Sequence, residues 1–136
     1  MNTLELFSGT KSFSKVAKKL GHSIFTIDNK QSLSPDLCCD ILELDINKFR
    51  DIDVIWASPP CTTFSVASIS THWTGGKGVY IPKTENAKTG IALVKKTVAI
   101  IEQLKPKYFF IENPRGVLRK LDLIPYERKT LCYCRY

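Results

Sequence analysis

The chain has 136 residues, 43% of them hydrophobic and 24% charged, which is the composition of one globular domain with a hydrophobic core. Its net charge is +7, no apolar run is long enough to cross a membrane, and we expect no signal peptide, so the composition predicts a cytoplasmic protein rather than a membrane protein. The five cysteines lack the C-x-x-C spacing of a zinc site, and no metal centre is expected.

The first part of the chain predicts strands separated by a short helix. Residues 3–7 predict a short strand, and a glycine turn follows it. A helix over residues 12–21 places its apolar side chains on one face at helical spacing: Phe13, Val16, Ala17 and Leu20. A second strand over residues 23–27 ends at Asp28, and a weaker third strand over residues 37–41 passes through Asp40.

The second part of the chain continues the alternation of strands and helices. In chain order we expect a strand over 53–57, a polar loop over 65–88, a helix over 89–104, a strand over 108–111, a helical turn over 115–121 and a sixth strand over 130–136. The apolar stripe of the long helix is Ile91, Val94, Val98 and Ile101, and Pro106 bars its continuation. The strand over 108–111 is apolar at every position, which is typical of a strand buried on both faces.

Strands that alternate with helices predict a doubly wound, mostly parallel α/β sheet. Such sheets bind ligands beyond the carboxyl ends of their strands. The polar residues that follow the predicted strands are Ser8, Gly9, Asp28, Asp40, Pro60, Cys61, Glu112 and Asn113. We therefore expect these residues to gather at one edge of the sheet and to form the functional site.

The excess of positive over negative charge lies entirely in the second part of the chain. Residues 1–53 contain 7 Lys and Arg against 8 Asp and Glu, whereas residues 54–136 contain 13 against 5. This distribution favours a polyanionic partner, of which nucleic acid is the commonest, although a solvated basic surface has the same composition.

Each residue of the predicted edge has two interpretations when it is taken alone. Gly9 is either a plain turn or a close approach to a ligand, because a single glycine is a poor match to the dinucleotide pattern G-x-G-x-x-G. Asp28 either accepts hydrogen bonds from ribose hydroxyls or caps a helix, and the same ambiguity holds for Asp40.

Cys61 is either a nucleophile at a strand end or a small apolar residue after a turn. Neither His22 nor His72 is placed to pair with it as in a cysteine hydrolase. Glu112 follows four apolar residues, where an unpaired carboxyl group is costly, and it is a candidate proton donor. A thiol and a carboxyl group at neighbouring strand ends suit attack on a heteroaromatic ring.

The segments LELFSGTKSF, FTID, CDI, SPPCTTFS and FFIENP, in this order, resemble the motifs of the cytosine-C5 DNA methyltransferases. The resemblance covers most of the chain and implies a Rossmann-like fold of the S-adenosylmethionine-dependent methyltransferase type, with restriction-modification as a setting. It also implies that the cofactor is bound by Phe7, Ser8, Gly9, Asp28, Asp40, Ile41 and Pro60.

The same resemblance implies the chemistry of the site. Cys61 would attack C6 of a cytosine flipped out of duplex DNA, so that C5 takes the methyl group, while Glu112 and Asn113 form the family's Glu-Asn motif and Glu112 hydrogen-bonds N3 and the exocyclic amine. Residues 65–88 occupy the position of the family's mobile catalytic loop. The residues expected to contact nucleic acid are Ser65, Lys77, Lys83 and Arg115.

The chain departs from the family pattern at several positions. Lys11 and Ser12 stand where further glycines are usual, Thr62 replaces a glutamine and Pro114 replaces a valine. LCYCRY resembles the strand before the family's arginine-bearing motif. We therefore expect a single partial catalytic domain over residues 1–136, incomplete at its carboxyl terminus, without a target-recognition domain, and completed by a second chain or a dimer through an apolar edge at residues 131–133.

Three other functions fit parts of the pattern. SPPC also resembles the motif of amino-methyltransferases, but those enzymes stack the flipped base on an aromatic residue where Cys61 stands here. An RNA cytosine methyltransferase has the same charge requirement. A nucleic-acid-binding or cofactor-binding module can keep the motifs without turnover.

Overall fold

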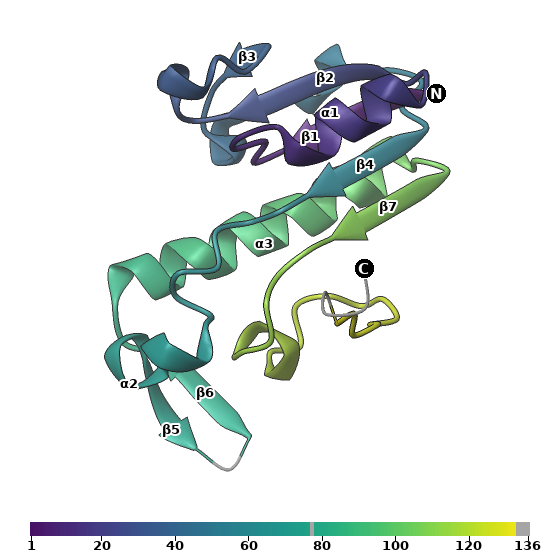
Figure 1. Cartoon of the computed structure of the whole chain (residues 1–136). Helices are drawn as coiled ribbons and strands as arrows, with labels where there is room; N and C mark the ends of the chain where they lie inside the picture. Colours follow the sequence, from purple (N-terminus) through teal and green to yellow (C-terminus); the bar gives the residue numbers. More distant parts are fainter. Residues whose placement is uncertain (77, 133–136) are drawn as a thin grey trace.

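The structure is a computed structural model that describes residues 1–76 and 78–132. Its centre is a parallel sheet with the strand order β3-β2-β1-β4-β7 (Figure 1). The strands are β1 (Asn2–Leu6), β2 (Ser23–Asp28), β3 (Leu37–Cys38), β4 (Val54–Ala57) and β7 (Tyr108–Ile111). The predicted doubly wound α/β fold is confirmed, and the register aligns Leu6 with Ala57 and Ala57 with Ile111, so the carboxyl ends of β1, β4 and β7 are level.

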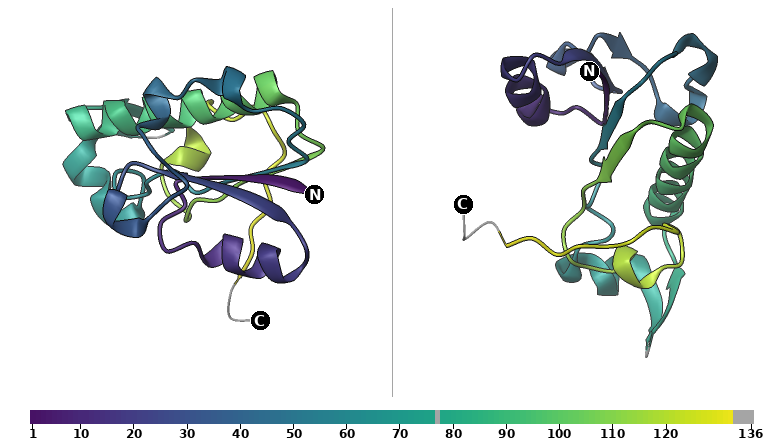
Figure 2. Two further views of the ribbon diagram at one scale, coloured as in Figure 1. Left: turned by 90° about the horizontal axis from the view of Figure 1, so that it is seen from above. Right: turned by 90° about the vertical axis from the view of Figure 1, so that its right-hand side faces the viewer.

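Helices α1 (Ser12–Lys19) and α3 (Glu85–Leu104) lie on opposite faces of the sheet (Figure 2). The shorter elements are η1 (Gln31–Leu33), η2 (Ile41–Glu43), η3 (Ile46–Lys48), η4 (Val66–Ser68), α2 (Ile69–His72), β5 (Trp73–Gly76), β6 (Val79–Pro82) and η5 (Leu118–Lys120). The expected helical turn over residues 115–121 is therefore present as η5. Among the described residues, no helix combines the length and the apolarity that a membrane crossing requires.

The apolar stripe predicted for α1 is wrong at two positions. Val16 and Leu20 are exposed, whereas Ser14 and Ala17 are buried. The buried face is rotated because the strand beneath α1 carries Glu5, whose carboxylate accepts a hydrogen bond from the Ser14 hydroxyl. A polar contact, and not an apolar stripe, therefore sets the face that this short helix presents to the sheet.

Helix α3 buries the predicted stripe and begins earlier than predicted. Val94, Val98 and Ile101 are buried. The helix begins at Glu85 because the Thr84 hydroxyl accepts a hydrogen bond from the Ala87 amide, which caps the first turn. It ends at Leu104, before Pro106, as predicted.

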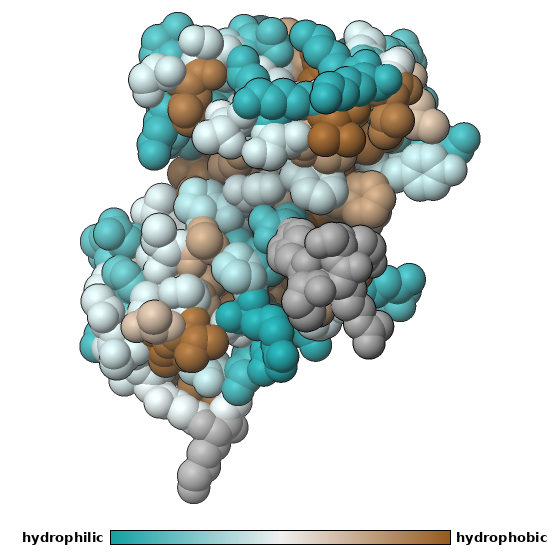
Figure 3. All heavy atoms as spheres, in the orientation of Figure 1, coloured by the Kyte–Doolittle hydropathy of each residue, from teal (hydrophilic) through white to brown (hydrophobic). Residues whose placement is uncertain are grey.

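The segment over residues 65–88 is not the irregular loop expected from its sequence. It folds into η4, α2 and the antiparallel hairpin of β5 and β6. Trp73 organises this region, since its ring packs against Phe64 at 5.9 Å and its indole nitrogen donates to the Thr63 carbonyl at 2.6 Å. Phe64, Trp73, Val94, Val117 and Leu118 form a second hydrophobic cluster below the sheet, and the space-filling view shows two masses joined by a narrower waist (Figure 3).

Strand β7 is not buried on both faces, so that prediction is also wrong. Tyr108 and Phe110 are 48% and 52% exposed, because α3 covers only the face of β7 that carries Phe109 and Ile111. On the open face, Trp56 stacks between Phe13, at 4.5 Å, and Phe110, at 5.6 Å.

The sixth strand expected over residues 130–136 falls partly outside the described residues. Residues 130–132 are described and form no strand, whereas 133–136 lie outside the described part of the chain.

Candidate active site at the carboxyl edge of the sheet

A cavity of about 280 Å³ lies at the carboxyl ends of β1 and β2. The predicted cofactor residues that line it are Phe7, Gly9, Asp28, Asp40, Ile41 and Pro60. Ser8 is the exception: it is buried beside the turn, and its hydroxyl has no hydrogen-bond partner in the described structure. The cavity wall is completed by Cys39 and Ser58, which begin the CDI and SPPCTTFS segments, and by residues that no motif indicated, namely Asn29, Lys30, Leu33, Thr89 and Leu93.

The turn after β1 is held by Asp28. One carboxylate oxygen accepts a hydrogen bond from the Gly9 amide at 2.9 Å, and the other accepts from the Lys30 amide at 3.0 Å. Each carboxylate oxygen has a further lone pair, so these contacts leave Asp28 able to accept from a ligand hydroxyl. Asp28 is thus a structural residue of the turn and a lining residue of the cavity at once.

The backbone of this turn is left-handed at three positions. Phe7, Gly9 and Lys11 have φ angles of 58°, 48° and 60°. Lys11 stands where the family pattern has a glycine, and it keeps the conformation that favours glycine. The departure noted in the sequence therefore changes the side chain and leaves the left-handed backbone in place.

Asp40 shows the capping role that its sequence left open. It is exposed, and its carboxylate accepts a hydrogen bond from the Leu42 amide at 2.9 Å, at the start of η2. The adjacent Ile41 is buried and contributes an apolar wall to the cavity.

Glu5 is a buried acid that the sequence analysis missed. It is 3% exposed beneath α1, and burial raises the pKa of its carboxyl group, although the hydrogen bond from Ser14 and the charge of Lys11 act in the opposite direction. The charge of Asp28 adds to the increase in this pKa. The acidic residue inside the apolar segment LELF was the feature that could have revealed it.

Cys61 lies directly after the two prolines that end β4, and it is half-buried. Its carbonyl accepts hydrogen bonds from the Phe64 amide at 2.9 Å and the Ser65 amide at 3.0 Å, which closes a tight turn. The fully buried Phe64 ring anchors that turn in the second hydrophobic cluster. The thiol is therefore carried on a fixed turn at the ligand edge and is not packed in the core.

Glu112 and Asn113 follow β7, the strand next to β4. The Glu112 amide donates to the Ala57 carbonyl at 2.8 Å, and the Asn113 side-chain amide donates to the Pro59 carbonyl at 2.9 Å. Asn113 thus joins the Glu-Asn segment to the Pro-Cys turn. Within the described residues, the Glu112 carboxylate makes no hydrogen bond or ion pair, and the buried carbonyl oxygen of Asn113 has no partner.

Two glycines that the sequence analysis missed allow the Cys61 turn to pack closely. A Cβ atom at Gly116 would lie 1.9 Å from the Phe64 carbonyl oxygen, and one at Gly90 would lie 2.9 Å from the Thr63 hydroxyl oxygen. The close contact at Gly116 accompanies a backbone hydrogen bond of 2.7 Å from the Val117 amide to the Phe64 carbonyl. Any side chain at Gly116 would have to displace the turn that carries Cys61. A glycine at the second position of the predicted helix over residues 89–104 was the visible indication at Gly90.

Two of the residues expected to contact nucleic acid, Ser65 and Arg115, lie at the bridge between Ser65 and Gly116. Ser65 is half-buried and bonded to Ser68, Lys83 is exposed and donates to the Ser70 carbonyl, and Arg115 is exposed. Lys77 lies outside the described residues.

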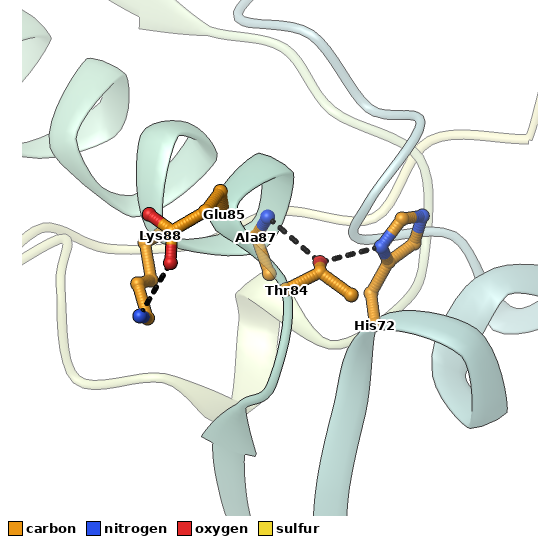
Figure 4. A network of polar contacts seen from close by, with 5 residues as sticks. All are labelled: His72, Thr84, Glu85, Ala87 and Lys88. Atoms are coloured by element: carbon orange, nitrogen blue, oxygen red, sulfur yellow. Dashed lines mark hydrogen bonds and ion pairs between the residues drawn. The ribbon is translucent and has the colours of Figure 1, made fainter.

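The hairpin region is joined to α3 by a small polar network around Thr84 (Figure 4). The His72 ring nitrogen Nδ1 and the Thr84 hydroxyl lie 2.8 Å apart, and this hydroxyl also caps α3 through the Ala87 amide. Glu85 and Lys88 form an ion pair on the first turn. His72 is therefore a structural residue of this joint.

A second hollow, of about 400 Å³, lies at the opposite end of the strands. Its lining includes Phe25, Lys48 and Arg50, and none of the predicted site residues. The smaller cavity holds the motif residues, so we take it as the candidate site. Among the described residues, no group of three or more His, Cys, Asp and Glu side chains is arranged to hold a metal ion.

Residues 1–124 match the model of the C-5 cytosine-specific DNA methylase family. The chain belongs to this family. Two curated proteins show the same relationship. The probable DNA (cytosine-5)-methyltransferase of Frog virus 3 (isolate Goorha) is 36% identical across the whole chain, and the type II methyltransferase M.CviJI of Paramecium bursaria Chlorella virus IL3A is 28% identical over 91% of it.

The matches cover 64% of the length of the first of these relatives and 35% of the second. The resemblance to this methylase family was carried by motifs in a fixed order along the chain. The structure brings those motifs to one edge of a parallel sheet. Pro60-Cys61 and Glu112-Asn113 follow the ends of the adjacent strands β4 and β7. The neighbouring cavity is lined by Phe7, Gly9, Asp40 and Ile41.

Proposed function

We propose that this chain carries the catalytic residues of a DNA cytosine-5-methyltransferase. The observation that supports this most directly is the joint between its two motifs. The Asn113 side chain donates to the Pro59 carbonyl, and this contact holds the Cys61 turn beside the end of β7, where Glu112 lies. A thiol and an unpaired carboxyl group at adjacent strand ends are what attack on a cytosine ring requires.

In the proposed reaction, the Cys61 thiolate forms a bond to C6 of the flipped cytosine. The electron pair of the C5–C6 double bond moves toward C5, while Glu112 hydrogen-bonds N3 and the exocyclic amine of the ring. C5 then takes up the methyl group, a base removes the C5 proton, and the returning electron pair expels the Cys61 thiolate. The half-buried position of Cys61 on a fixed turn suits this role.

The cavity next to Cys61 fits the cofactor. S-Adenosylmethionine, when bound, would supply an electrophilic methyl group and would leave as S-adenosylhomocysteine, whose sulfur keeps the electron pair of the broken S–CH3 bond. Phe7 and Ile41 provide apolar walls, and Asp28 keeps carboxylate lone pairs for ribose hydroxyls. Ser8 has a buried hydroxyl without a partner in the described structure, which is consistent with a polar ligand at this turn.

Cys39 also lines the cavity but does not compete with Cys61 in this proposal. Burial raises the pKa of the Cys39 thiol, and the nearby Asp40 carboxylate adds to that increase. A thiol with a raised pKa is less ionised and therefore a weaker nucleophile at neutral pH.

A methyl-transfer assay with labelled S-adenosylmethionine and duplex DNA tests this function. We expect transfer by the parent protein, the same transfer by Cys38→Ser, which removes an exposed thiol, and none by Cys61→Ser. Transfer that survives Cys61→Ser contradicts the thiol mechanism and favours an amino-methyltransferase. Duplex binding without transfer by the parent favours a binding module.

We also propose that residues 1–136 form one part of a catalytic domain that a complementing chain or a dimer completes. The support is the open sheet face, on which Phe110 and Tyr108 are about half exposed beside the stacked Trp56, together with the exposed Leu131. Analytical ultracentrifugation of the parent and of Phe110→Ser tests this. We expect self-association or partner binding that the substitution weakens, and a monomer that is fully active alone contradicts it.

A further inference from the structure

A short segment after the Glu-Asn motif carries much of the excess positive charge. Residues 115–129 contain five basic and two acidic residues, and all five basic side chains are exposed: Arg115, Arg119, Lys120, Arg128 and Lys129. The one ion pair found in the described part of the chain joins Glu85 and Lys88, so none of these five cations is neutralised by an ion pair there. We call residues 115–129 the basic segment.

The basic segment begins at the turn that carries the nucleophile. Gly116 pairs with Ser65 in an isolated antiparallel bridge, and the Val117 amide donates to the Phe64 carbonyl. Val117 and Leu118 are then buried in the second hydrophobic cluster. The backbone that carries Arg115 and Arg119, on either side of this buried part, is therefore held at a fixed position relative to the Cys61 turn.

Two further contacts keep the cations together on one surface. The Lys120 ammonium lies 5.4 Å from the centre of the Tyr80 ring and 3.4 Å from its hydroxyl, which joins η5 to the β5–β6 hairpin. The Arg128 guanidinium donates to the Arg119 carbonyl at 2.6 Å and closes the loop between them. Hydrophilic side chains gather on this lower mass of the molecule, near the end of the described chain (Figure 3).

We propose that the basic segment binds the phosphates of the DNA duplex that flank the target cytosine. This inference rests on the proposed function and adds a binding surface to it. Like charges held together without neutralising partners repel one another, and a polyanion relieves that repulsion while releasing its own counterions. Its contacts to the DNA phosphates would fix the position of the protein along the duplex, and they would not distinguish one base from another.

Duplex binding measured over a range of salt concentrations tests the surface. In the double variant Arg119→Gln/Lys129→Gln, both altered side chains are exposed and neither makes a side-chain contact in the described structure. We plot the logarithm of the binding constant against the logarithm of the salt concentration. We expect the negative slope of the variant to be shallower than that of the parent by about 1.8, because each of two lost phosphate contacts contributes about 0.9. We also expect its affinity to fall about tenfold or more at moderate salt.

The matched control is Lys15→Gln/Lys19→Gln, which removes the same charge from exposed positions on α1. It should keep the parental slope, and both variants should keep the parental melting temperature and the parental affinity for S-adenosylmethionine. The proposal is overturned if Arg119→Gln/Lys129→Gln keeps the parental slope, or if both variants lose slope and affinity equally. Methyl transfer by the parent protein would leave the proposed function standing in either case. Tighter binding of an RNA duplex than of a DNA duplex also overturns it.

Discussion

At the scale of single residues, the site depends on positions where the backbone passes very close to the Cys61 turn. Gly116 leaves no space for a Cβ atom against the Phe64 carbonyl. Phe64 is fully buried and cannot move aside without disturbing the second hydrophobic cluster. The geometry of the turn that carries the thiol is therefore set by the packing of Gly116 and Phe64.

The substitution Gly116→Ala should displace this turn. Overpacking of a well-packed interior costs about 1–3 kcal/mol, and we expect a loss of this size in the free energy of unfolding, measured by chemical denaturation. Gly76→Ala is the control, because a Cβ atom there meets nothing within 4 Å. Equal stability of Gly116→Ala and the parent would show that the turn is not held as described.

Glu5 gives a second prediction at this scale, which concerns pH. Its pKa in the folded state is raised above the usual value of 4.5, so the folded state binds its proton more tightly than the unfolded state does. The contribution of Glu5 to the stability of the fold is therefore greatest below about pH 4.5, and it is lost as the pH rises through the folded-state pKa. The neighbouring Lys11 and Asp28 charges modify this pKa in opposite directions.

Glu5→Gln should remove this dependence, since glutamine keeps a polar partner for Ser14 and carries no charge. We expect the free energy of unfolding of the variant minus that of the parent to increase as the pH rises from about 4 to 7, because only the parent loses stability over this range. Urea unfolding at several pH values measures it. A difference that is constant with pH, or that changes in the opposite direction, contradicts the assignment.

At the scale of elements, the β5–β6 hairpin and α3 are joined at Thr84. Its hydroxyl caps α3 and also contacts His72, so one side chain serves both elements (Figure 4). The capped start of α3 in turn places Gly90 against the Cys61 turn. The hairpin, the helix and the Cys61 turn are thus parts of one packed unit.

Thr84→Ala should lower the free energy of unfolding by about 1 kcal/mol, the usual cost of losing an N-cap, and should release His72. Thermal unfolding followed by circular dichroism measures the loss. Thr71→Ala is the matched control, because Thr71 is exposed in α2 and makes no side-chain hydrogen bond among the described contacts. A parental melting temperature for Thr84→Ala would show that the Thr84 hydroxyl does not stabilise the start of α3.

Much of the sheet was predictable from the sequence because each strand is a short apolar run that ends at a polar residue or a proline. The parallel direction of the strands follows from the alternation with helices, and so does the gathering of Asp28, Cys61 and Glu112 at one edge, whereas the strand order comes from the structure alone. The hairpin was missed because its strands, WTGG and VYIP, are too short and too rich in glycine and proline for a clear period. Their order depends on the long-range packing of Trp73 against Phe64, which no local pattern reveals.

The burial of β7 was misjudged for a related reason. Four apolar residues in a row indicate burial on both faces, but the sequence does not say which segments supply the cover. Close approaches, such as that at Gly116, likewise depend on two segments that are 52 positions apart, Phe64 and Gly116.

At the scale of the whole molecule, the chain has two hydrophobic clusters with different chemical surroundings. The sheet cluster carries the cavity lined by Phe7, Asp28 and Ile41 at its edge, and the second cluster carries the Cys61 turn and the basic segment. Pro60 lines this cavity and Cys61 follows it directly, so the cavity and the Cys61 turn are adjacent where the two clusters meet.

The central claim is that Cys61 forms the bond to cytosine, and trapping that bond tests it most directly. Duplex DNA that contains 5-fluorocytosine should form a covalent complex with the parent protein in the presence of S-adenosylmethionine, because fluorine at C5 prevents the final elimination. Peptide mapping by mass spectrometry should place the adduct on Cys61, Cys38→Ser should form the same complex, and Cys61→Ser should form none. An adduct on any other residue, or a complex that persists in Cys61→Ser, would contradict the account.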